Sequence, residues 1–549
     1  MPSVSAHVAV TLATQIDHVF GLMGNGNAWF LDALVRDTDA SFTAVRHEAG
    51  AVVAADAYHR ASGRLAAATA TYGAGFTNTL TALAEAVQAH VPLVLVVGDE
   101  PTSGPRPWDV DQIALAAAVG ARTYTVGRTD AAATTVIAIE HALTYRVPTV
   151  LAIPYDVATR EAGPIPTAPA PALPAPLQPS GFGQAAVAEL ARALAGAQRP
   201  LLLAGRGAWV AGAGEALGRI ADAVGAATAT TALGRGVFPR PEYDLGVTGG
   251  FGAEEAMQQV READVAVVFG ASLNQFTMRF GDLFAPGTRV VQVDTAPAAT
   301  HPHVGSFVRG DAAVVAAALA DELDQLRPAG SGWRESLDAA ALRTQEAGEQ
   351  FAADGRLDPR AVAARIGELL PEDRVVVSDG GHFIGWANMY WPVASPDRMM
   401  MIGTAFQSIG LGFPSVPGAA LAQPDATVVL TTGDGGGLMA LADLESAVRV
   451  AGGRGLAVVW NDGAYGAEVN LYGLKGVARG PMMIPDVDFA GLASAVGAHG
   501  VVVRELADLQ VLAEWTAQPA SERPYLLLDV RISSSVVAPY QQEIIRVNS

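Results

Sequence analysis

The chain of 549 residues contains no cysteine. This absence excludes disulfide bonds, metal sites built on thiolates and cysteine nucleophiles, and it leaves the cellular compartment open. Charged residues are scarce, at 16% of the chain, and the acids outnumber the bases, so that the formal net charge is −20 at pH 7. A surface of this sign repels nucleic acids and anionic membranes. Small molecules are therefore the expected partners.

Long apolar runs are missing as well. No stretch of about 18 uncharged apolar residues occurs, and residues 1–24 lack the basic region and unbroken apolar core of a signal peptide. We therefore expect no membrane span and a soluble, cytoplasmic protein. Half of the residues are apolar, and Ala and Gly are abundant, which is typical of a large globular protein. The length suggests about three domains.

Proline and glycine mark the expected domain boundaries. The segment PIPTAPAPALPAPLQPSG (164–181) cannot continue a helix or a central strand, and RPAGSG (327–332) forms a second break. Between these breaks, short apolar runs alternate with Ala-rich segments of helical length, a pattern that favours parallel sheets. The prediction is an α/β fold of three domains, each a mainly parallel sheet flanked by helices. The expected ranges are a first domain 1–163, a linker 164–182, a middle domain 183–328, a linker 329–357, a third domain 358–535 and a tail 536–549.

Two acidic residues follow two expected strands of the third domain. Asp434 lies in the glycine-rich run 433–437 after the strand near 426–432, and Asp462 follows Asn461 after the strand 455–460. Ligands bind beyond the carboxyl ends of such strands, so both acids can face one divalent ion, and oxygen ligands favour Mg²⁺ or Ca²⁺. The glycines let main-chain N–H groups approach a phosphate, but no Lys-Ser/Thr follows as in a nucleotide P-loop. A pair of ordinary loop aspartates is the alternative.

The spacing of this stretch resembles the thiamine-diphosphate-binding motif, in which GDG is followed by roughly two dozen residues and then by two asparagines. Here GDG (433–435) precedes 25 residues and then Asn461-Asp462. The resemblance implies that thiamine diphosphate is bound together with Mg²⁺. The implied metal ligands are Asp434, Asp462 and the main-chain carbonyl of Ala464, and the implied cofactor contacts include Gly433, Gly435, Gly436 and Tyr465. Asp462 stands where this family usually has an asparagine.

A second element of the same family is expected in the first domain. The stretch AVRHEAGAVVAADAYHRASG (44–63) has a strand-like start and then a helix that opens at Glu48. It resembles the element that binds the cofactor's aminopyrimidine ring, with Glu48 as the activating glutamate and with Thr71 and Asn78 as further contacts. An acid at a helix start is also favoured by the helix dipole alone. The neighbouring stretches 20–34 and 69–99 follow the order of the family, which favours the functional interpretation.

Two further stretches of the third domain complete the resemblance. The segment GTAFQSIGLGFPSVPGAALA (403–422) is similar to the one that places an apolar side chain under the cofactor. This similarity implies that Ile409 bends the cofactor and that the Gln407 carbonyl accepts the 4′-amino group. The loop SDGGHFIGW (378–386) is similar to a diphosphate-contacting loop, with Gly380, Gly381 and His382 as the contacts. A core isoleucine and a structural histidine are the alternatives.

Together these elements span nearly the whole chain and resemble the acetolactate synthase and pyruvate decarboxylase superfamily, with pyrimidine-binding, middle and diphosphate-binding domains. The resemblance implies decarboxylation of a 2-oxo acid such as pyruvate and a homodimer or homotetramer with sites between subunits. Where pyruvate decarboxylases carry adjacent histidines, the stretch 103–124 offers Gln112, and Asn25 stands where decarboxylases have an acid. Both residues favour an acetolactate-synthase-like carboligase that joins the product to an aldehyde or a second 2-oxo acid.

Three alternatives remain open. A simple 2-oxo acid decarboxylase would release an aldehyde. For Gln112 itself, a polar residue that faces solvent on a helix is the alternative. A non-catalytic relative could keep the fold. A nicotinamide oxidoreductase would also explain glycine-rich α/β domains, but its fingerprint of strand, glycine turn and later acid does not assemble in this sequence. The middle domain shows no stretch that we can assign to FAD or coenzyme A.

Overall fold

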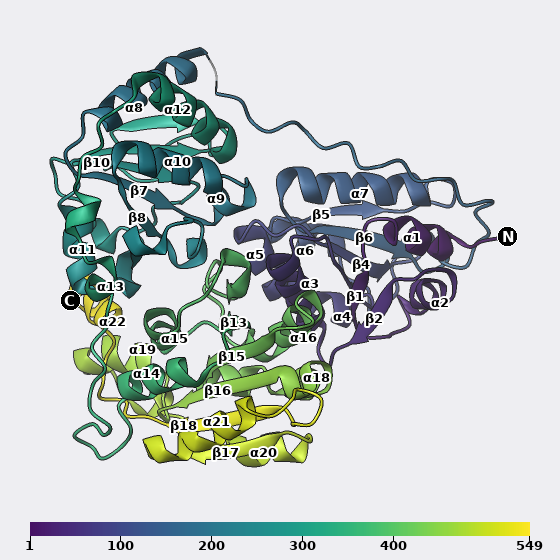
Figure 1. Cartoon of the computed structure of the whole chain (residues 1–549). Coiled ribbons are helices and arrows are strands. Elements are labelled where there is room, and N and C mark those ends of the chain that lie inside the picture. The colour runs from purple at the N-terminus through teal and green to yellow at the C-terminus, as the bar shows by residue number, and fades with distance from the viewer. Residues whose placement is uncertain (180, 549) are drawn as a thin grey trace.

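The computed structural model describes residues 1–179 and 181–548, and it contains three parallel sheets of six strands each (Figure 1). Residue 180 of the expected linker and residue 549 of the expected tail lie outside the described residues. The first sheet has the order β2-β1-β3-β4-β6-β5. Its strands are β1 (His18–Gly21), β2 (Ser41–Ala44), β3 (Ala67–Ala70), β4 (Val94–Asp99), β5 (Arg122–Thr125) and β6 (Thr149–Pro154).

Helices cover both faces of the first sheet, because successive strand residues enter two different cores. Val94 and Val96 of β4 pack with α1, α2 and α7, whereas Leu95 and Val97 pack with α3 and α5. This arrangement explains why the strand reads as a continuous apolar run. The helices of this part are α1 (Val4–Leu12), α2 (Ala28–Asp37), α3 (Glu48–Ser62), α4 (Ala74–Thr77), α5 (Leu80–Gln88), α6 (Gln112–Ala118) and α7 (Ala131–Tyr145).

The second sheet forms the middle part of the chain and has the order β12-β11-β10-β7-β8-β9. Its strands are β7 (Pro200–Ala204), β8 (Ala227–Thr230), β9 (Asp244–Val247), β10 (Val265–Phe269), β11 (Arg289–Asp294) and β12 (Ser306–Arg309). The helices are α8 (Gly181–Ala195), α9 (Arg206–Val210), α10 (Gly214–Val224), α11 (Glu254–Arg261) and α12 (Ala312–Leu326), and the short α13 (Ala339–Leu342) follows.

The third sheet has the order β14-β13-β15-β16-β18-β17. Its strands are β13 (Arg374–Ser378), β14 (Met399–Met401), β15 (Thr427–Gly433), β16 (Gly455–Asn461), β17 (His499–Val503) and β18 (Leu526–Arg531). The helices are α14 (Pro359–Leu369), α15 (Ile384–Tyr390), α16 (Gly412–Ala422), α17 (Asp434–Met439), α18 (Leu444–Ala451), α19 (Gly466–Leu471), α20 (Phe489–Ala495), α21 (Gln510–Thr516) and α22 (Pro539–Asn548).

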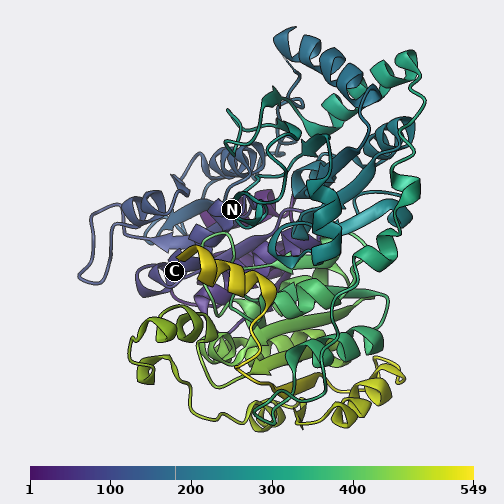
Figure 2. The ribbon, with the colours of Figure 1, turned by 90° about the vertical axis from the view of Figure 1, so that its left-hand side faces the viewer.

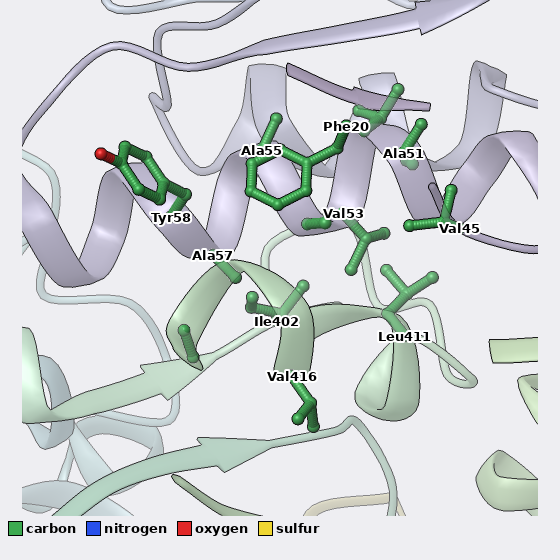
Figure 3. Close-up of a cluster of buried hydrophobic side chains, with 14 of the residues drawn as sticks. Phe20, Val45, Ala51, Val53, Ala55, Ala57, Tyr58, Ile402, Leu411 and Val416 are labelled. Carbon is green, nitrogen blue, oxygen red and sulfur yellow. The ribbon is translucent and has the colours of Figure 1, made fainter. Parts of the chain in front are cut away.

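The first and third sheets share one hydrophobic core through helices α3 and α16. Figure 3 shows residues of α3 such as Val53 and Ala57 above Ile402 and Val416 of the third part. The helices approach so closely at Gly418 that an added Cβ would lie 1.9 Å from the carbonyl oxygen of Ala54. A glycine is therefore required at this crossing.

The C-terminal segment, expected as a tail, includes the helix α22, which lies against the middle part and the third part of the chain. Figure 2 shows it in yellow on the face turned to the viewer. Tyr540 is buried, and its ring meets Phe251 and Phe276 of the middle part edge to face. Its hydroxyl donates to the carbonyl oxygen of His382. The C-terminal helix thereby joins two parts of the molecule.

The three parallel sheets confirm the predicted α/β class with three sheet-and-helix units. The expected domain boundaries, as exact residue numbers, stay a prediction. Strand order reverses direction beside β1 in the first sheet and beside β13 in the third sheet. Open α/β sheets bind ligands outside the carboxyl ends of strands at such reversal points. The loops after β1 and β3, and those after β13 and β15, are therefore the places to look for a site.

Candidate active site

Three polar side chains meet at the carboxyl edge of the third sheet, and we call them the C-terminal cluster: His382, Asp434 and Asp462. They follow β13, β15 and β16, which are adjacent in the sheet. His382 Nε2 lies 2.9 Å from Asp462 Oδ2. The Asp434 carboxylate accepts hydrogen bonds of 2.9 Å from the N–H groups of Gly435 and Gly463. The structure thus brings together both acids that the sequence singled out.

The C-terminal cluster carries more negative than positive charge. Burial, and then the neighbouring carboxylate of Asp462, raise the pKa of Asp434 to about 7. Burial lowers the pKa of His382, but the carboxylates of Asp462 and Asp434 outweigh it, so that the pKa of His382 is raised overall. Within residues 1–179 and 181–548, neither carboxylate has an ion pair with a lysine or arginine. A bound cation would relieve this imbalance.

The segment 403–410 reaches the same edge of the sheet. An added Cβ on Gly380 would lie 2.6 Å from the carbonyl oxygen of Ser408 and 3.2 Å from Ile409 Cγ2. Gln407 is exposed and has a φ of 59°, which is uncommon for a residue with a side chain. The predicted residues Gly380, Gly381, His382, Ile409, Gly433, Asp434, Gly435, Gly436, Asp462, Ala464 and Tyr465 therefore share one neighbourhood, with Gln407 beside it.

The chemistry of this neighbourhood fits Mg²⁺ and a diphosphate. Oxygen ligands predominate, and the carboxylate of Asp462 lies close enough to Asp434 to raise its pKa. In the part of the chain that the structure describes, no group of three or more His, Cys, Asp or Glu side chains could hold a metal ion. A metal at the two acids would therefore need main-chain and ligand oxygens as well, which is how Mg²⁺ is commonly bound with substrate phosphates.

A second group of polar residues lies at the carboxyl edge of the first sheet, and we call it the N-terminal cluster: Asn25, Glu48, Thr71, Tyr72 and Asn78. Asn78 Nδ2 donates to Glu48 Oε2 at 3.0 Å, and Asn25 Nδ2 donates to the Tyr72 hydroxyl at 2.8 Å. Thr71 Oγ1 accepts from the N–H of Gly26 at 2.9 Å. The structure places the predicted residues Asn25 after β1, Glu48 at the start of α3, Thr71 after β3 and Asn78 at the end of α4, and Tyr72 joins them.

Gln112 lies at the start of α6 and is almost completely buried, with 3% of its surface exposed. Its Oε1 accepts from the Gly73 N–H at 2.9 Å, and its Nε2 donates to the Gly98 carbonyl at 2.9 Å and to Asp99 Oδ1 at 3.1 Å. The idea of a solvent-facing polar residue is therefore wrong. The amide is used within the chain to hold the turn that leads into the N-terminal cluster.

The two clusters remain separate within one chain. Across the described ranges, no hydrogen bond or ion pair links Glu48 to the C-terminal cluster. The contact between the two parts near Glu48 instead runs through Arg46, whose N–H donates to Asp443 Oδ1 at 2.7 Å and whose guanidinium pairs with Glu445.

Sequence reasoning missed one residue of this region, Asp379. It is fully buried and accepts hydrogen bonds from the N–H groups of Gly380, Gly410 and Leu411 and from the Thr432 hydroxyl. It thereby ties the 378–386 loop to the 403–412 segment and to β15. Its position directly after an expected strand and before two glycines resembles that of Asp434 and could have indicated a role at this edge of the sheet.

None of the helices in the described residues combines the length and the apolar character that a membrane span requires.

Three family models match the chain in the order of its sheets. They are the thiamine pyrophosphate enzyme N-terminal TPP binding domain (residues 2–115), central domain (187–319) and C-terminal TPP binding domain (379–528). The parallel sheets with paired acids at one edge, together with these matches, place the chain in a class of diphosphate-binding α/β enzymes. The chain belongs to the thiamine pyrophosphate enzyme family and is a thiamine-diphosphate-dependent enzyme, which confirms the predicted family and organic cofactor.

Individual relatives are similar over much of their length. A probable acetolactate synthase large subunit of Methanocaldococcus jannaschii is 28% identical over 80% of this chain and 76% of its own. A sulfoacetaldehyde acetyltransferase of Roseovarius nubinhibens is 26% identical over 99% of this chain and 94% of its own. The solved thiamine diphosphate-dependent 4-hydroxybenzoylformate decarboxylase of Rhodococcus jostii RHA1 is 22% identical, with a TM-score of 0.79 over 97% of this chain and 99% of that one. This last likeness shows the shared fold.

Proposed function

We propose that this enzyme breaks and forms carbon–carbon bonds next to a carbonyl group in the manner of acetolactate synthase. It decarboxylates a 2-oxo acid such as pyruvate and joins the remaining fragment to an aldehyde or a second 2-oxo acid. The observation that carries the cofactor chemistry is the pairing of Asp434 and Asp462 at the strand-order reversal of the third sheet. The names of the acetolactate synthase and acetyltransferase relatives favour the carboligation step.

The C-terminal cluster would hold Mg²⁺ and the diphosphate. Asp434, Asp462 and the main-chain carbonyl of Ala464 supply oxygen ligands for the metal. The imidazole of His382 shares its proton with Asp462, so it offsets part of the acid's charge beside the phosphates. The glycines of the segments 380–381 and 433–436 carry no side chains, so a diphosphate can approach the main chain there. Tyr465, against Gly435, borders this place.

The N-terminal cluster would activate the cofactor. Thiamine diphosphate supplies an acidic ring carbon and an electron sink for the decarboxylation. Glu48 would face the pyrimidine ring nitrogen and exchange a proton with it, and Asn78 keeps the carboxyl group in one orientation by its hydrogen bond of 3.0 Å. The Gln407 carbonyl would accept a hydrogen bond from the amino group of the ring, and Ile409 would support the cofactor. Thr71 fixes the loop around Gly26 at the edge of this site.

Two residues near the reacting carbon shape the outcome of the reaction. Asn25 is exposed at the mouth of the N-terminal cluster and cannot supply a proton as a carboxylic acid would. This property favours carboligation over protonation to an aldehyde. Gln112 acts through the turn at Gly73, so we assign it a positioning role rather than contact with the substrate.

The complete site requires a second copy of the chain. Glu48 has its hydrogen-bonding partner within its own cluster, and large apolar side chains are exposed around both clusters. They include Met23, Trp29, Trp108 and Ile113 near the N-terminal cluster and Met439 and Met483 near the C-terminal cluster. Exposed apolar groups on this scale mark an interaction surface. A homodimer or homotetramer would cover them and bring Glu48 of one copy to the metal site of the other.

Mass spectrometry of the products tests the reaction. The enzyme is supplied with thiamine diphosphate, Mg²⁺ and pyruvate, or with branched or aromatic 2-oxo acids, with and without an aldehyde acceptor. A coupled product larger than the substrate's decarboxylated fragment supports the carboligase. Aldehyde alone, even with an acceptor present, would instead support a simple 2-oxo acid decarboxylase, the kind of activity for which the matched solved protein is named. Cofactor binding without turnover of the whole panel would support a non-catalytic relative.

A further inference from the structure

Three charged side chains are buried between the first and third parts of the molecule, and we call them the Arg60 cluster: Asp56, Arg60 and Glu85. Their exposed fractions are 1%, 3% and 1%. Asp56 and Arg60 lie one turn apart on α3, and Glu85 lies on the neighbouring helix α5. Burying charges costs desolvation energy that the pairing only partly returns, so such a cluster is a weak means of stabilising a fold. It calls for another explanation.

The Arg60 guanidinium holds the two acids together and also crosses to the third part. It pairs with both carboxylate oxygens of Asp56 and donates from Nη2 to Glu85 Oε1 at 3.2 Å. Its Nη1 donates to the Met401 carbonyl at 3.0 Å, at the end of β14. With one oxygen held by Arg60, Glu85 directs its other oxygen, Oε2, to the N–H of Phe406 at 2.7 Å.

The Arg60 cluster is therefore hydrogen-bonded to both ends of the segment 401–406. The segment leads directly into Gln407, whose φ of 59° is held without a glycine. The next residue closes the turn, since the Ser408 N–H donates to the Gly403 carbonyl at 2.8 Å. Ile409 then lies against Gly380 of the C-terminal cluster. A residue with a side chain keeps a left-handed backbone conformation only where its surroundings fix it. For Gln407, the adjacent fixed group is the Phe406 N–H, which donates to Glu85.

We propose that Glu85, held by Arg60, is a positioning residue that fixes the main chain at Gln407 and Ile409 for the aminopyrimidine end of the cofactor. This inference rests on the proposed cofactor site. Glu85 belongs to the same chain as the segment it holds, unlike the Glu48 that a second copy would contribute. The first part of each chain therefore has two roles. Through Glu85 it positions the pyrimidine-binding segment of its own third part, and through Glu48 it completes the cofactor site of the second copy.

Glu85→Gln tests this role with almost no change of shape. A glutamine offers one acceptor where the carboxylate offers two, so its amide N–H group must face either Arg60 or the Phe406 N–H, and one of these contacts is lost. Arg60→Lys is the second variant, because lysine keeps the charge but cannot bridge two acids and a carbonyl in a fixed fork. The matched control is Gln423→Ala, which removes a hydrogen bond of 2.6 Å to the Ala61 carbonyl between the same two parts but away from the segment 401–408.

Calorimetry on the full-length enzyme compares thiamine diphosphate with inorganic pyrophosphate, both in the presence of Mg²⁺. For Glu85→Gln and Arg60→Lys we expect affinity for thiamine diphosphate to fall about tenfold while affinity for pyrophosphate stays unchanged, because only the pyrimidine end is affected. Gln423→Ala should leave the ratio of the two affinities as in the wild type.

Two results would overturn the positioning role: unchanged affinity for thiamine diphosphate in a folded variant, or an equal loss for both ligands, which indicates general loosening. One folded variant of the two suffices for the comparison, and circular dichroism establishes the folding. Failure of the wild-type enzyme to bind thiamine diphosphate would have a different meaning, since it would refute the cofactor site itself.

Discussion

Nε2 of His382 lies 2.9 Å from Oδ2 of Asp462, the acid that stands where the family motif usually has an asparagine. The other carboxylate oxygen of Asp462 accepts from the Ala464 N–H at 3.2 Å, as an amide oxygen also could. The extra negative charge of this position is therefore directed at a histidine. This pairing would let the enzyme keep a second acid close to the proposed diphosphate site without leaving the acid's charge unopposed.

We expect Asp462→Asn to weaken Mg²⁺ binding about tenfold without unfolding the protein, since the number of charged ligands tunes the affinity for divalent cations. The amide keeps the contact with the Ala464 N–H but loses its charge. Titration calorimetry with Mg²⁺ at saturating thiamine diphosphate measures the change. The control is Asp486→Asn, which removes an exposed acid outside the C-terminal cluster and should leave the affinity unchanged. Tighter binding by Asp462→Asn would show that repulsion of the diphosphate dominates.

Glu48→Gln should bind the cofactor normally and lose at least about 100-fold in turnover, the usual range for a positioned acid or base. The amide keeps the shape of the side chain and still meets Asn78, but it cannot hold a transferable proton. Turnover is followed as carbon dioxide release from a panel of 2-oxo acids, and cofactor affinity by calorimetry. Asn78→Ala removes the hydrogen bond to the Glu48 carboxyl group but keeps the group itself, so this variant should lose less turnover than Glu48→Gln. Full turnover in Glu48→Gln would remove Glu48 from the mechanism.

The sequence was informative where the chemistry is local. The glycine-rich turn at Asp434 and the acid at Asp462 follow strands that pair directly, so that spacing alone predicted their meeting. Even so, the segment after Asp434 forms the short helices α17 and α18 with a 3₁₀ turn between them, a break that the spacing of the two acids does not indicate. The strands predicted near 426–432 and at 455–460 match β15 and β16.

Contacts between distant segments could not be predicted in the same way. Nothing near Glu85 in the sequence indicates Phe406, and their hydrogen bond depends on how α3 and α16 cross. The same holds for Gln112, whose helical surroundings suggested exposure. Its burial follows from the way the loop 101–111 folds back over the sheet and brings α6 to Gly73 and Gly98. Packing of this kind is set by the whole chain, and local patterns do not encode it.

Gln112→Leu should lower stability and slow the reaction of every 2-oxo acid to a similar extent. Leucine fills a similar volume but leaves the Gly73 N–H and the Gly98 carbonyl without partners, at a cost of about 1–3 kcal/mol for each unpaired buried group. Thermal unfolding and product ratios are measured together. A changed ratio of coupled product to aldehyde at unchanged stability would contradict the positioning role and place Gln112 against the substrate.

Gly418→Ala should destabilise the contact between α3 and α16. The added methyl group would lie 1.9 Å from the Ala54 carbonyl oxygen, and main chain cannot move aside as a flexible side chain could. Overpacking of this kind costs about 1–3 kcal/mol, which thermal unfolding detects. Gly287→Ala is the control, since a Cβ there meets nothing within 4 Å and the backbone is not left-handed. Equal melting temperatures for both variants would show that the helices can separate freely.

The buried carboxyl group of Asp379 makes stability depend on pH in a predictable direction. Burial raises its pKa from the ordinary value of 3.8 to about 6, although the Leu411 N–H and the Thr432 hydroxyl oppose the shift. The folded protein therefore holds this proton more tightly than the unfolded chain does. The resulting stabilisation is complete below about pH 3.8 and is lost as the pH rises through about 6.

Asp379→Asn removes this dependence because an amide resembles the protonated acid at every pH. Its oxygen can accept from Gly380 and Leu411, and its N–H group can donate to Thr432 Oγ1, whose own hydrogen then turns to the Gly433 carbonyl. Relative to the wild type, the variant should gain about 2–3 kcal/mol between pH 4 and pH 7, at about 1.4 kcal/mol for each pKa unit. Thermal unfolding of the cofactor-free proteins across this range measures the difference. The control is Ser378→Ala, a non-titrating change in the adjacent buried residue, whose stability difference from the wild type should not vary with pH. If the stability difference of Asp379→Asn were also constant with pH, Asp379 would stay ionised throughout this range.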